Sequence, residues 1–188
     1  RNMVTTIQVP RVEATRENTA EYGLMISEEV PNAGLTIPFY KGSVEEGMNL
    51  PFECTGSAVI RTARISKRAP EVTWLERHMN MTQLFVGLGS EPFAMILCKP
   101  NHDQDKKLPD LDTARCFVFP AGHGIMIHKG TWHDFPLSVG NPVTVLTANS
   151  PEVVDALASM GEPKEMNHGD VYKIDIQKHT GTVLLSPI

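Results

Sequence analysis

The stretch WLERHMNMTQ, residues 74–83, carries the first polar site and gives the clearest indication of the fold. Glu76 and His78 stand two residues apart, so on a β-strand their side chains point to the same face and both reach one ligand. Gln83 follows five residues after His78, a spacing at which a short turn and the next strand bring a third oxygen or nitrogen donor beside them. The stretch therefore predicts a strand with a polar binding site on one face.

A second polar stretch lies downstream, in GHGIMIHKGTWH at residues 122–133. Gly122, His128, Gly130 and His133 are spaced there as G-x5-H-x-G-x2-H. Glycine adopts backbone conformations that tight turns need and other residues avoid. The glycines therefore predict a tight turn that re-aims His133.

Turn-forming residues punctuate the whole chain, because 14 glycines and 14 prolines stand at short intervals among apolar runs. This pattern favours short strands joined by turns, as in an all-β sandwich or barrel. In SAVIRTARIS, residues 57–66, the alternation puts Arg61 and Arg64 on opposite faces of one strand. We expect further strands at 72–78, 83–88, 92–98, 114–119, 124–128, 143–148, 170–176 and 181–185, and short helices at 16–22, capped by Thr15, and at 151–160, capped by Ser150.

The composition excludes several classes of protein. With 188 residues, 41% of them hydrophobic and 21% charged, the chain has the size and composition of one globular domain. A net charge of −5 gives no general attraction to nucleic acid or to an anionic membrane, and apolar runs such as FAMILC at 93–98 are too short to span a bilayer. Three cysteines without a CxxC pair fit a reducing compartment, so we expect a cytoplasmic protein with a small-molecule or protein partner.

The two polar stretches resemble the two motifs of the cupins, G-x5-H-x-H-x3–4-E-x6-G and G-x5-P-x-G-x2-H-x3-N. On the first motif, Glu76 takes the first His position, His78 the second and Gln83 the Glu position. On the second motif, His133 takes the His position, and His128 stands where the motif has proline. The resemblance implies an all-β jelly-roll barrel with a few short peripheral helices, in which His78 and His133 meet.

A closer resemblance is to the ureidoglycolate lyases, a cupin family. It rests on four strings in order along the chain: EYGLMIS from Glu21, LERHMNMTQLFVGLG from Leu75, LPDLDTARCFVF from Leu108 and HKGTWHDFPLSVG from His128. These strings cover roughly residues 20–148, which we interpret as the barrel core. Residues 149–188 then form an extension made of a helix and a strand pair, and we expect 1–188 to be a single domain.

The family resemblance implies a lyase that cleaves ureidoglycolate into glyoxylate and urea. Two imidazoles with a carboxylate or amide oxygen suit Zn, Ni or Mn. His78, Gln83 and His133 would hold this divalent metal, with Glu76 as a fourth ligand or as the proton shuttle. Glu76 and His133 are the expected catalytic residues. The expected substrate-binding residues are Arg64, which we prefer over Arg61 as the partner of the substrate carboxylate, Gln83, His128 and Trp132.

Two alternatives remain open. The chain departs from the family in FVG at 85–87, where the family has F-x-P, and in WHDFP at 132–136, which is one residue longer than the usual W-H-x-P. A related cupin lyase, hydrolase or isomerase acting on another small hydroxy or keto carboxylate is therefore one alternative. A sensor that binds a small acid without turnover is another. Such barrels commonly pair edge strands, so we expect a homodimer.

Overall fold

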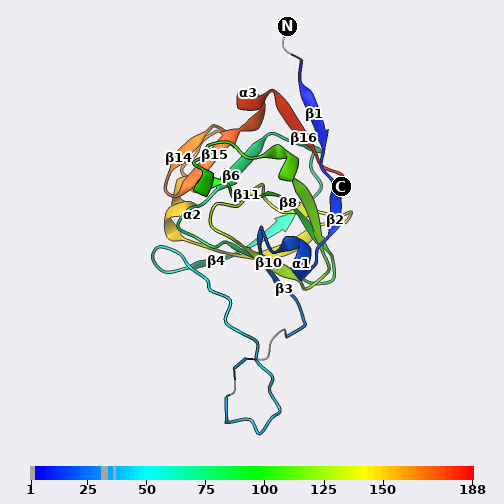
Figure 1. The fold of residues 1–188 in the computed structure, drawn as a ribbon, viewed down its shortest axis with the longest axis vertical. Coiled ribbons are helices and arrows are strands. Elements are labelled where there is room, and N and C mark those ends of the chain that lie inside the picture. The colour runs from blue at the N-terminus through cyan, green and yellow to red at the C-terminus, as the bar shows by residue number, and fades with distance from the viewer. Residues whose placement is uncertain (1–2, 31–33, 36) are drawn as a thin grey trace.

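Strand β8 (Phe93–Cys98) forms the centre of the structure, because its six consecutive apolar residues leave it no polar face. The computed structural model describes residues 3–30, 34–35 and 37–188, and all six residues of β8 are buried in it. A strand buried on both faces needs a packed layer on each side. A five-stranded sheet provides one layer and a three-stranded sheet the other, with the large sheet that contains β8 between them (Figure 1).

The strands are arranged in three sheets, and each is short, as the spacing of turn residues predicts. The five-stranded sheet has the order β3 (Gly23–Ile26), β10 (Gly124–Ile127), β7 (Leu84–Leu88), β13 (Val143–Asn149) and β4 (Val59–Ile65). The three-stranded sheet has the order β1 (Thr5–Gln8), β16 (Thr182–Leu185) and β5 (Glu71–Val72). The large sheet has the order β14 (Met166–His168), β15 (Val171–Asp175), β6 (Trp74–Arg77), β11 (Trp132–His133), β8, β9 (Arg115–Phe119) and β2 (Arg11–Glu13), with β12 (Leu137–Ser138) also paired to β8.

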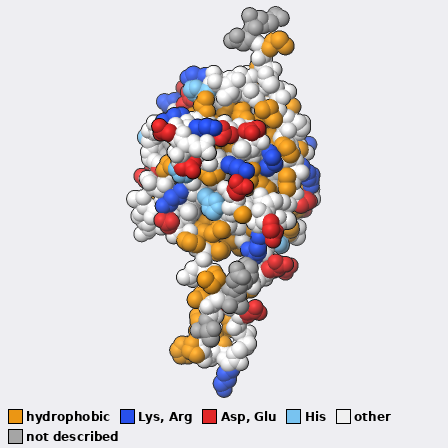
Figure 2. All heavy atoms as spheres, viewed as in Figure 1, with side chains coloured by type: hydrophobic (Ala, Val, Ile, Leu, Met, Phe, Trp, Pro, Cys, Tyr) orange, Lys and Arg blue, Asp and Glu red, His pale blue; other side chains and the backbone are white. Residues whose placement is uncertain are grey.

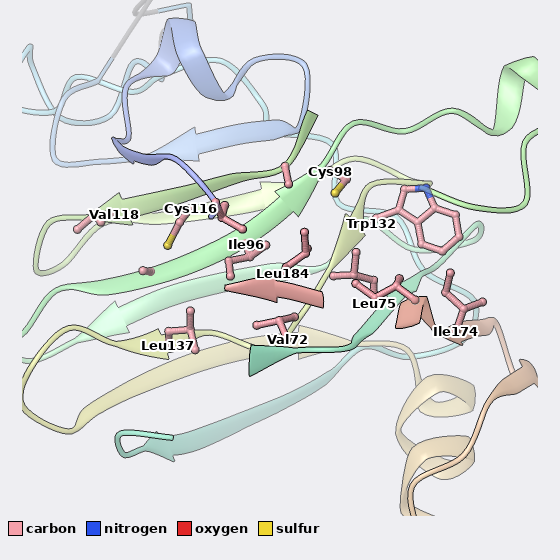
Figure 3. Close-up of a cluster of buried hydrophobic side chains, with 14 residues drawn as sticks. Val72, Leu75, Ile96, Cys98, Cys116, Val118, Trp132, Leu137, Ile174 and Leu184 are labelled. Atoms are coloured by element: carbon pink, nitrogen blue, oxygen red, sulfur yellow. The ribbon is translucent and has the colours of Figure 1, made fainter. Parts of the chain in front are cut away.

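Two hydrophobic clusters hold the three layers together. Ala94, Ile96 and Cys98 of β8 pack toward the three-stranded sheet, in the cluster that Figure 3 shows around Leu184. The alternate residues Phe93, Met95 and Leu97 pack in a second cluster with side chains of the five-stranded sheet. Each fully buried Leu, Ile or Phe stabilises the fold by about 1.5–3 kcal/mol relative to an exposed side chain. The core therefore fixes the large sheet firmly, and with it the strands β6 and β11.

Three short helices lie outside the sheets, as predicted for peripheral elements. Helix α2 (Pro151–Ala158) begins where predicted, with the Ser150 side chain accepting a hydrogen bond from the Val153 amide. Helix α1 (Arg16–Thr19) has the predicted Thr15 cap but is only four residues long. The chain then turns into β3, so the helix expected over 16–22 is too long. Helix α3 (Ile176–Thr180) and two short 3-10 turns, His102–Gln104 and Leu111–Thr113, complete the helical elements of the described residues.

The all-β, cupin-like fold class is confirmed, with one difference in closure and one in connectivity. In the described part of the chain the strands form three sheets and not a closed barrel. The strand pair expected at 170–176 and 181–185 is wrong, because its two strands lie in different sheets. Strand β15 pairs with β6 and β14, whereas β16 pairs with β1 and β5. Helix α3, capped by the Asp175 side chain, redirects the chain between them.

The segment between β3 and β4 leaves the sheets and extends as a long loop at the bottom of Figure 1. Figure 2 shows hydrophobic side chains along it. Its described residues include exposed apolar side chains at Phe39, Tyr40 and Met48. Composition and periodicity did not indicate this projection.

None of the helices in the described residues has both the length and the apolar character needed to cross a membrane.

Candidate active site

Strands β6 and β11 of the large sheet bring the two polar stretches of the sequence together. They pair antiparallel, with His133 directly opposite Glu76. The turn before β11 contains Gly130 at a φ of 84°, a conformation that favours glycine, and the predicted tight turn is therefore present. His78 follows directly after β6. Residues 55 positions apart in the chain thus meet on one face of the sheet.

A cavity of about 390 Å³ lies between this face and the five-stranded sheet. Glu76, His133 and Phe135 line it from the large sheet, and Gln83 lies on its wall just before β7. Its remaining lining residues come from β4, β13 and α2: Arg61, Thr62, Ala63, Thr147, Asn149, Val154, Leu157 and Ala158. The cavity is large enough for a small organic acid.

Three buried side chains, Glu76, His78 and His133, converge beside this cavity, and two of them, Glu76 and His133, line it. The Nε2 atom of His78 lies 3.2 Å from the Oε2 atom of Glu76, and the rings of His78 and His133 have centroids 5.0 Å apart. One nitrogen or oxygen donor atom from each of Glu76, His78 and His133 lies within 4.8 Å of the others. Sequence spacing predicted that Glu76 and His78 share a face, and the contact between them agrees with that prediction.

Backbone carbonyl groups fix the orientation of both imidazoles. The Nδ1 atom of His78 lies 2.7 Å from the carbonyl oxygen of Asp170, and that of His133 lies 3.1 Å from the carbonyl oxygen of Thr131. Since a carbonyl oxygen only accepts, each Nδ1 carries the proton and donates it. In the neutral His133 ring the Nε2 lone pair is therefore free, whereas the Nε2 atom of His78 faces the Oε2 atom of Glu76. A histidine held in this way is oriented to bind a metal ion or to accept a proton.

The charges in the site depend on one another. Burial by itself raises the pKa of Glu76, but contacts with His78, His133 and Lys173 outweigh it and hold the pKa below its usual range. Burial lowers the pKa of His133 to about 4, so this ring is neutral at neutral pH. Burial also acts to lower the pKa of His78, but the adjacent Glu76 carboxylate raises it overall. The site therefore combines an ionised carboxylate with a neutral His133 imidazole.

Gln83 is held at the cavity wall by a short chain of hydrogen bonds. Its Nε2 donates to the Oδ1 atom of Asn149 at 2.6 Å, and the Nδ2 atom of Asn149 donates to the Thr147 hydroxyl at 2.9 Å. The Oε1 atom of Gln83 is buried and has no hydrogen-bond partner among the described residues. Buried polar atoms normally have a partner, so this oxygen is suited to accept a hydrogen bond from a ligand or to coordinate a metal.

The other residues expected to bind substrate lie elsewhere. Arg61 and Arg64 are both exposed, but Arg61, on the alternate face of β4, lines the cavity at the place that we expected for Arg64. Strand periodicity identified the choice between the two arginines but could not decide it. The Nε2 atom of His128 contacts the Ala20 carbonyl oxygen at 2.8 Å, outside the cavity.

Trp132 is a core residue in this structure. Its indole N–H donates to Asn101 at 2.9 Å, and the guanidinium carbon of Arg77 lies 4.4 Å from the centre of its rings. Its side chain is completely buried in the cluster of Figure 3, on the face of the large sheet that looks away from the cavity. Alternation explains this placement, since Trp132 and His133 are neighbours on one strand.

Two residues of the C-terminal region touch the site and were missed by the sequence interpretation. The Nζ atom of Lys173 lies 3.0 Å from the Oε1 atom of Glu76, and Asp170 holds His78 through its carbonyl group. Asp170 directly precedes β15, and Lys173 lies within it. A lysine between Tyr172 and Ile174 in the strand VYKID is the one signal that could have drawn attention to this region.

Glu76, His78 and His133 form a possible metal-binding triad. Two observations indicate that they fit a divalent cation. Their donor set of two imidazoles and one carboxylate is a common one for zinc and related metals. In addition, the Nε2 atom of His78 is buried without a hydrogen-bond partner among the described residues, although Glu76 lies nearby.

The fold and the site define a cupin-like protein, in which short antiparallel strands hold histidine and carboxylate side chains in a cavity between sheets. A sequence model described as Ureidoglycolate lyase matches residues 6–159, and the chain belongs to this family.

Two curated relatives illustrate how far this similarity extends. Proteins named ureidoglycolate lyase from Salmonella typhimurium and Salmonella newport are 39% identical over 70 residues, which is 37% of this chain and 40% of each relative. The chain thus matches about two fifths of the length of these relatives. Among solved structures, the dTDP sugar isomerase from Desulfovibrio desulfuricans G20 is 15% identical, with a TM-score of 0.38, over 68% of this chain and 77% of that protein.

Proposed function

We propose that the chain is a ureidoglycolate lyase, which cleaves ureidoglycolate into glyoxylate and urea. The observation that carries this proposal is the convergence of Glu76, His78 and His133 beside a small cavity, within the region that matches the family. The relatives that share the name support the substrate, and the cavity supplies groups of the kinds that the reaction needs.

The substrate is a small anion with one carboxylate, one hydroxyl and one urea group. Arg61 lines the cavity, and its guanidinium group is suited to bind the carboxylate through two parallel hydrogen bonds. The free Oε1 atom of Gln83 is suited to accept a hydrogen bond from the urea N–H groups. Together these contacts would orient the carbon that carries both the hydroxyl and the nitrogen toward Glu76.

The reaction moves one proton and breaks one bond. The hydroxyl group loses its proton, its oxygen forms the carbonyl group of glyoxylate, and the carbon–nitrogen bond breaks with its electron pair going to nitrogen. That nitrogen takes up a proton to give urea, so no other reactant is consumed. Glu76 is ionised at neutral pH and lies in the cavity, so we assign it the transfer of this proton from oxygen to nitrogen.

His78 and His133, with the oxygen of Gln83, would hold a divalent cation of the Zn, Ni or Mn type. The backbone anchoring of both rings through Nδ1 and the unpartnered Oε1 atom of Gln83 support this assignment. A bound cation would lower the pKa of the substrate hydroxyl, as divalent cations do for bound water.

The test measures glyoxylate and urea released from racemic ureidoglycolate by the purified chain, with and without prior chelation. We expect equal amounts of both products, and we expect chelation to abolish their release. His133→Ala should reduce kcat/KM by at least about 100-fold, as for loss of a group that acts directly in the reaction. His123→Ala, which changes a histidine outside the cavity, is the matched control and should retain activity.

Each outcome has a defined meaning. Release that survives chelation would assign His78, Gln83 and His133 to direct substrate contact. If neither product is released with Zn, with Ni or with Mn, the proposed activity is overturned. A thermal-shift screen would then identify other small hydroxy and keto acids that bind, and a test of their turnover would separate a related enzyme from a sensor.

A further inference from the structure

The segment from Gly169 to Lys173 reaches the site from beyond the region that the family model matches. That match ends at residue 159, whereas β15 begins at Val171. Strand β15 pairs antiparallel with β6 and places Lys173 directly opposite Glu76. The two side chains therefore meet as a cross-strand pair whose position is fixed by the backbone ladder of the sheet.

The two oxygens of the Glu76 carboxylate have different partners. Its Oε1 atom accepts a hydrogen bond from the Lys173 ammonium at 3.0 Å, whereas its Oε2 atom faces His78 at 3.2 Å. The Glu76 side chain is 12% exposed and the Lys173 side chain 26%, so bulk water screens this pair only partly. A carboxylate that already binds a cation through one oxygen is a weaker ligand for a second cation.

The same segment also fixes His78. The Asp170 carbonyl oxygen accepts the His78 Nδ1 proton at 2.7 Å, and the Asp170 carboxylate accepts hydrogen bonds from the amides of Met79 and Asn80. One short stretch of chain thus holds two of the three members of the triad. Lys173 is half-buried and also lines a second cavity of about 520 Å³, beyond Phe135 and Leu157.

We propose that Lys173 is a positioning residue that keeps Glu76 out of the metal coordination sphere, and so leaves its carboxylate free to carry the proton. The inference rests on the proposed function, because it selects between two roles for Glu76 in that reaction, metal ligand and proton shuttle. His78 and His133 then remain the protein nitrogen ligands. Without Lys173, Glu76 would turn toward the cation and become a ligand itself.

The experiment compares Lys173→Met, Lys173→Arg and Lys178→Met with the unaltered chain. Lys178 forms a surface pair with Glu165 at the same distance of 3.0 Å, and so provides the matched control. The first readout is the affinity for Zn²⁺ alone, measured in competition with a coloured chelator. The second is the separate change of kcat and KM for ureidoglycolate.

We expect Lys173→Met to bind Zn²⁺ roughly tenfold more tightly, which is the size of effect that neighbours of metal ligands commonly have. We also expect its kcat to fall by at least about tenfold with little change in KM. Lys173→Arg should restore both values, and Lys178→Met should alter neither. If Lys173→Met does not fold, Lys173→Gln, which is uncharged but still polar, replaces it.

Unchanged or weaker Zn²⁺ binding by the Lys173 variant would overturn the inference, as would a wild-type chain that binds no Zn²⁺. The metal readout does not require turnover. Tighter Zn²⁺ binding by a chain that never cleaves ureidoglycolate would therefore reject the proposed activity and retain the role of Lys173.

Discussion

Two clusters in this molecule have the same three residue types and the same glutamate–lysine distance. In the cavity, Glu76 contacts Lys173 at 3.0 Å and His78 at 3.2 Å. At the surface, Glu165 contacts Lys178 at 3.0 Å and His179 at 2.6 Å. They differ in exposure, since the His78 side chain is 2% exposed and that of His179 is 37% exposed.

This difference shows what makes a cluster of charged residues a site. The cluster around Glu165 is exposed to solvent, so its ion pairs contribute little to the free energy of folding. Around Glu76 water is largely excluded, each imidazole is held by a backbone carbonyl, and a cavity opens beside the carboxylate. Residue types and the glutamate–lysine distance do not distinguish the two clusters, whereas burial and backbone anchoring do.

The largest expected effect separates the two glutamates by activity. Glu76→Gln keeps the shape of the side chain but removes its ability to take a proton, so kcat for glyoxylate release should fall by about 100- to 10,000-fold. Glu165→Gln should change kcat by less than about twofold, since it alters a surface pair. Comparable kcat values for the two variants would remove the functional distinction between the clusters.

The second prediction uses pH to separate the clusters, in metal-free protein. The pKa of His133 is about 4 in the folded chain, below its ordinary value of 6.5, so between these limits the unfolded chain binds more protons. Stability therefore falls as pH drops from about 6.5 to about 4, by up to about 1.4 kcal/mol per pH unit. His133→Asn should lack this loss when urea unfolding is followed at several pH values.

The surface glutamate, Glu165, should affect stability in a lower pH range than His133. The contact with Lys178 contributes most to lowering the pKa of Glu165 to about 2, from an ordinary value of 4.5. Its contribution to stability is therefore present above about pH 4.5 and lost below it. The pH dependence of Glu165→Gln should match that of the wild type between pH 6.5 and 4.5. A difference in that range would contradict the separation of the clusters.

The third prediction tests the backbone anchor of His78. Gly169 precedes Asp170 and has a φ of 61°, and a Cβ atom there would lie 2.5 Å from the Cβ atom of Ala156. Gly169→Ala should therefore destabilise the fold by about 1–3 kcal/mol, as overpacking and backbone strain commonly do. Gly161→Ala has open space around it and is the control, measured by the same urea unfolding. Equal stability of the two variants would show that the anchor tolerates displacement.

The smallest expected effect concerns salt. Lys178→Met removes an exposed ion pair, so we expect a loss of no more than about 0.5 kcal/mol at low ionic strength. Near 1 M salt, where the screening length is about 3 Å, this difference should disappear. A loss that persists at high salt would mean that the surface cluster is more strongly coupled to the fold than its exposure indicates.

Local patterns predicted much of the fold and of the site. Strands occur at the predicted positions, since each depends on a short apolar run between turn residues. The strand expected at 72–78, however, is divided into β5 and β6, which lie in different sheets. Glu76 and His78 share a site because alternation on one strand is a local property. The helix after Ser150 was also predictable, because its cap and first-turn residues adjoin each other in the chain.

Long-range register accounts for what the sequence did not predict. Lys173 meets Glu76 across 97 residues, and nothing near either residue specifies the other as its partner. The choice between Arg61 and Arg64 likewise depends on which face of β4 looks into the cavity. The separation of β15 from β16 follows from helix α3, whose cap at Asp175 is weak as a sequence signal among several acidic residues.

The pairing of β1 with β16 has a mechanical consequence. The two strands run parallel, with Thr5 beside Thr182 and Gln8 beside Leu185, so the outward ends of the pair point in opposite directions. A force that pulls the two ends of the described chain apart would shear this ladder and load all its hydrogen bonds at once. The pair thus acts as a clamp that must break before tension can reach the large sheet and the cavity.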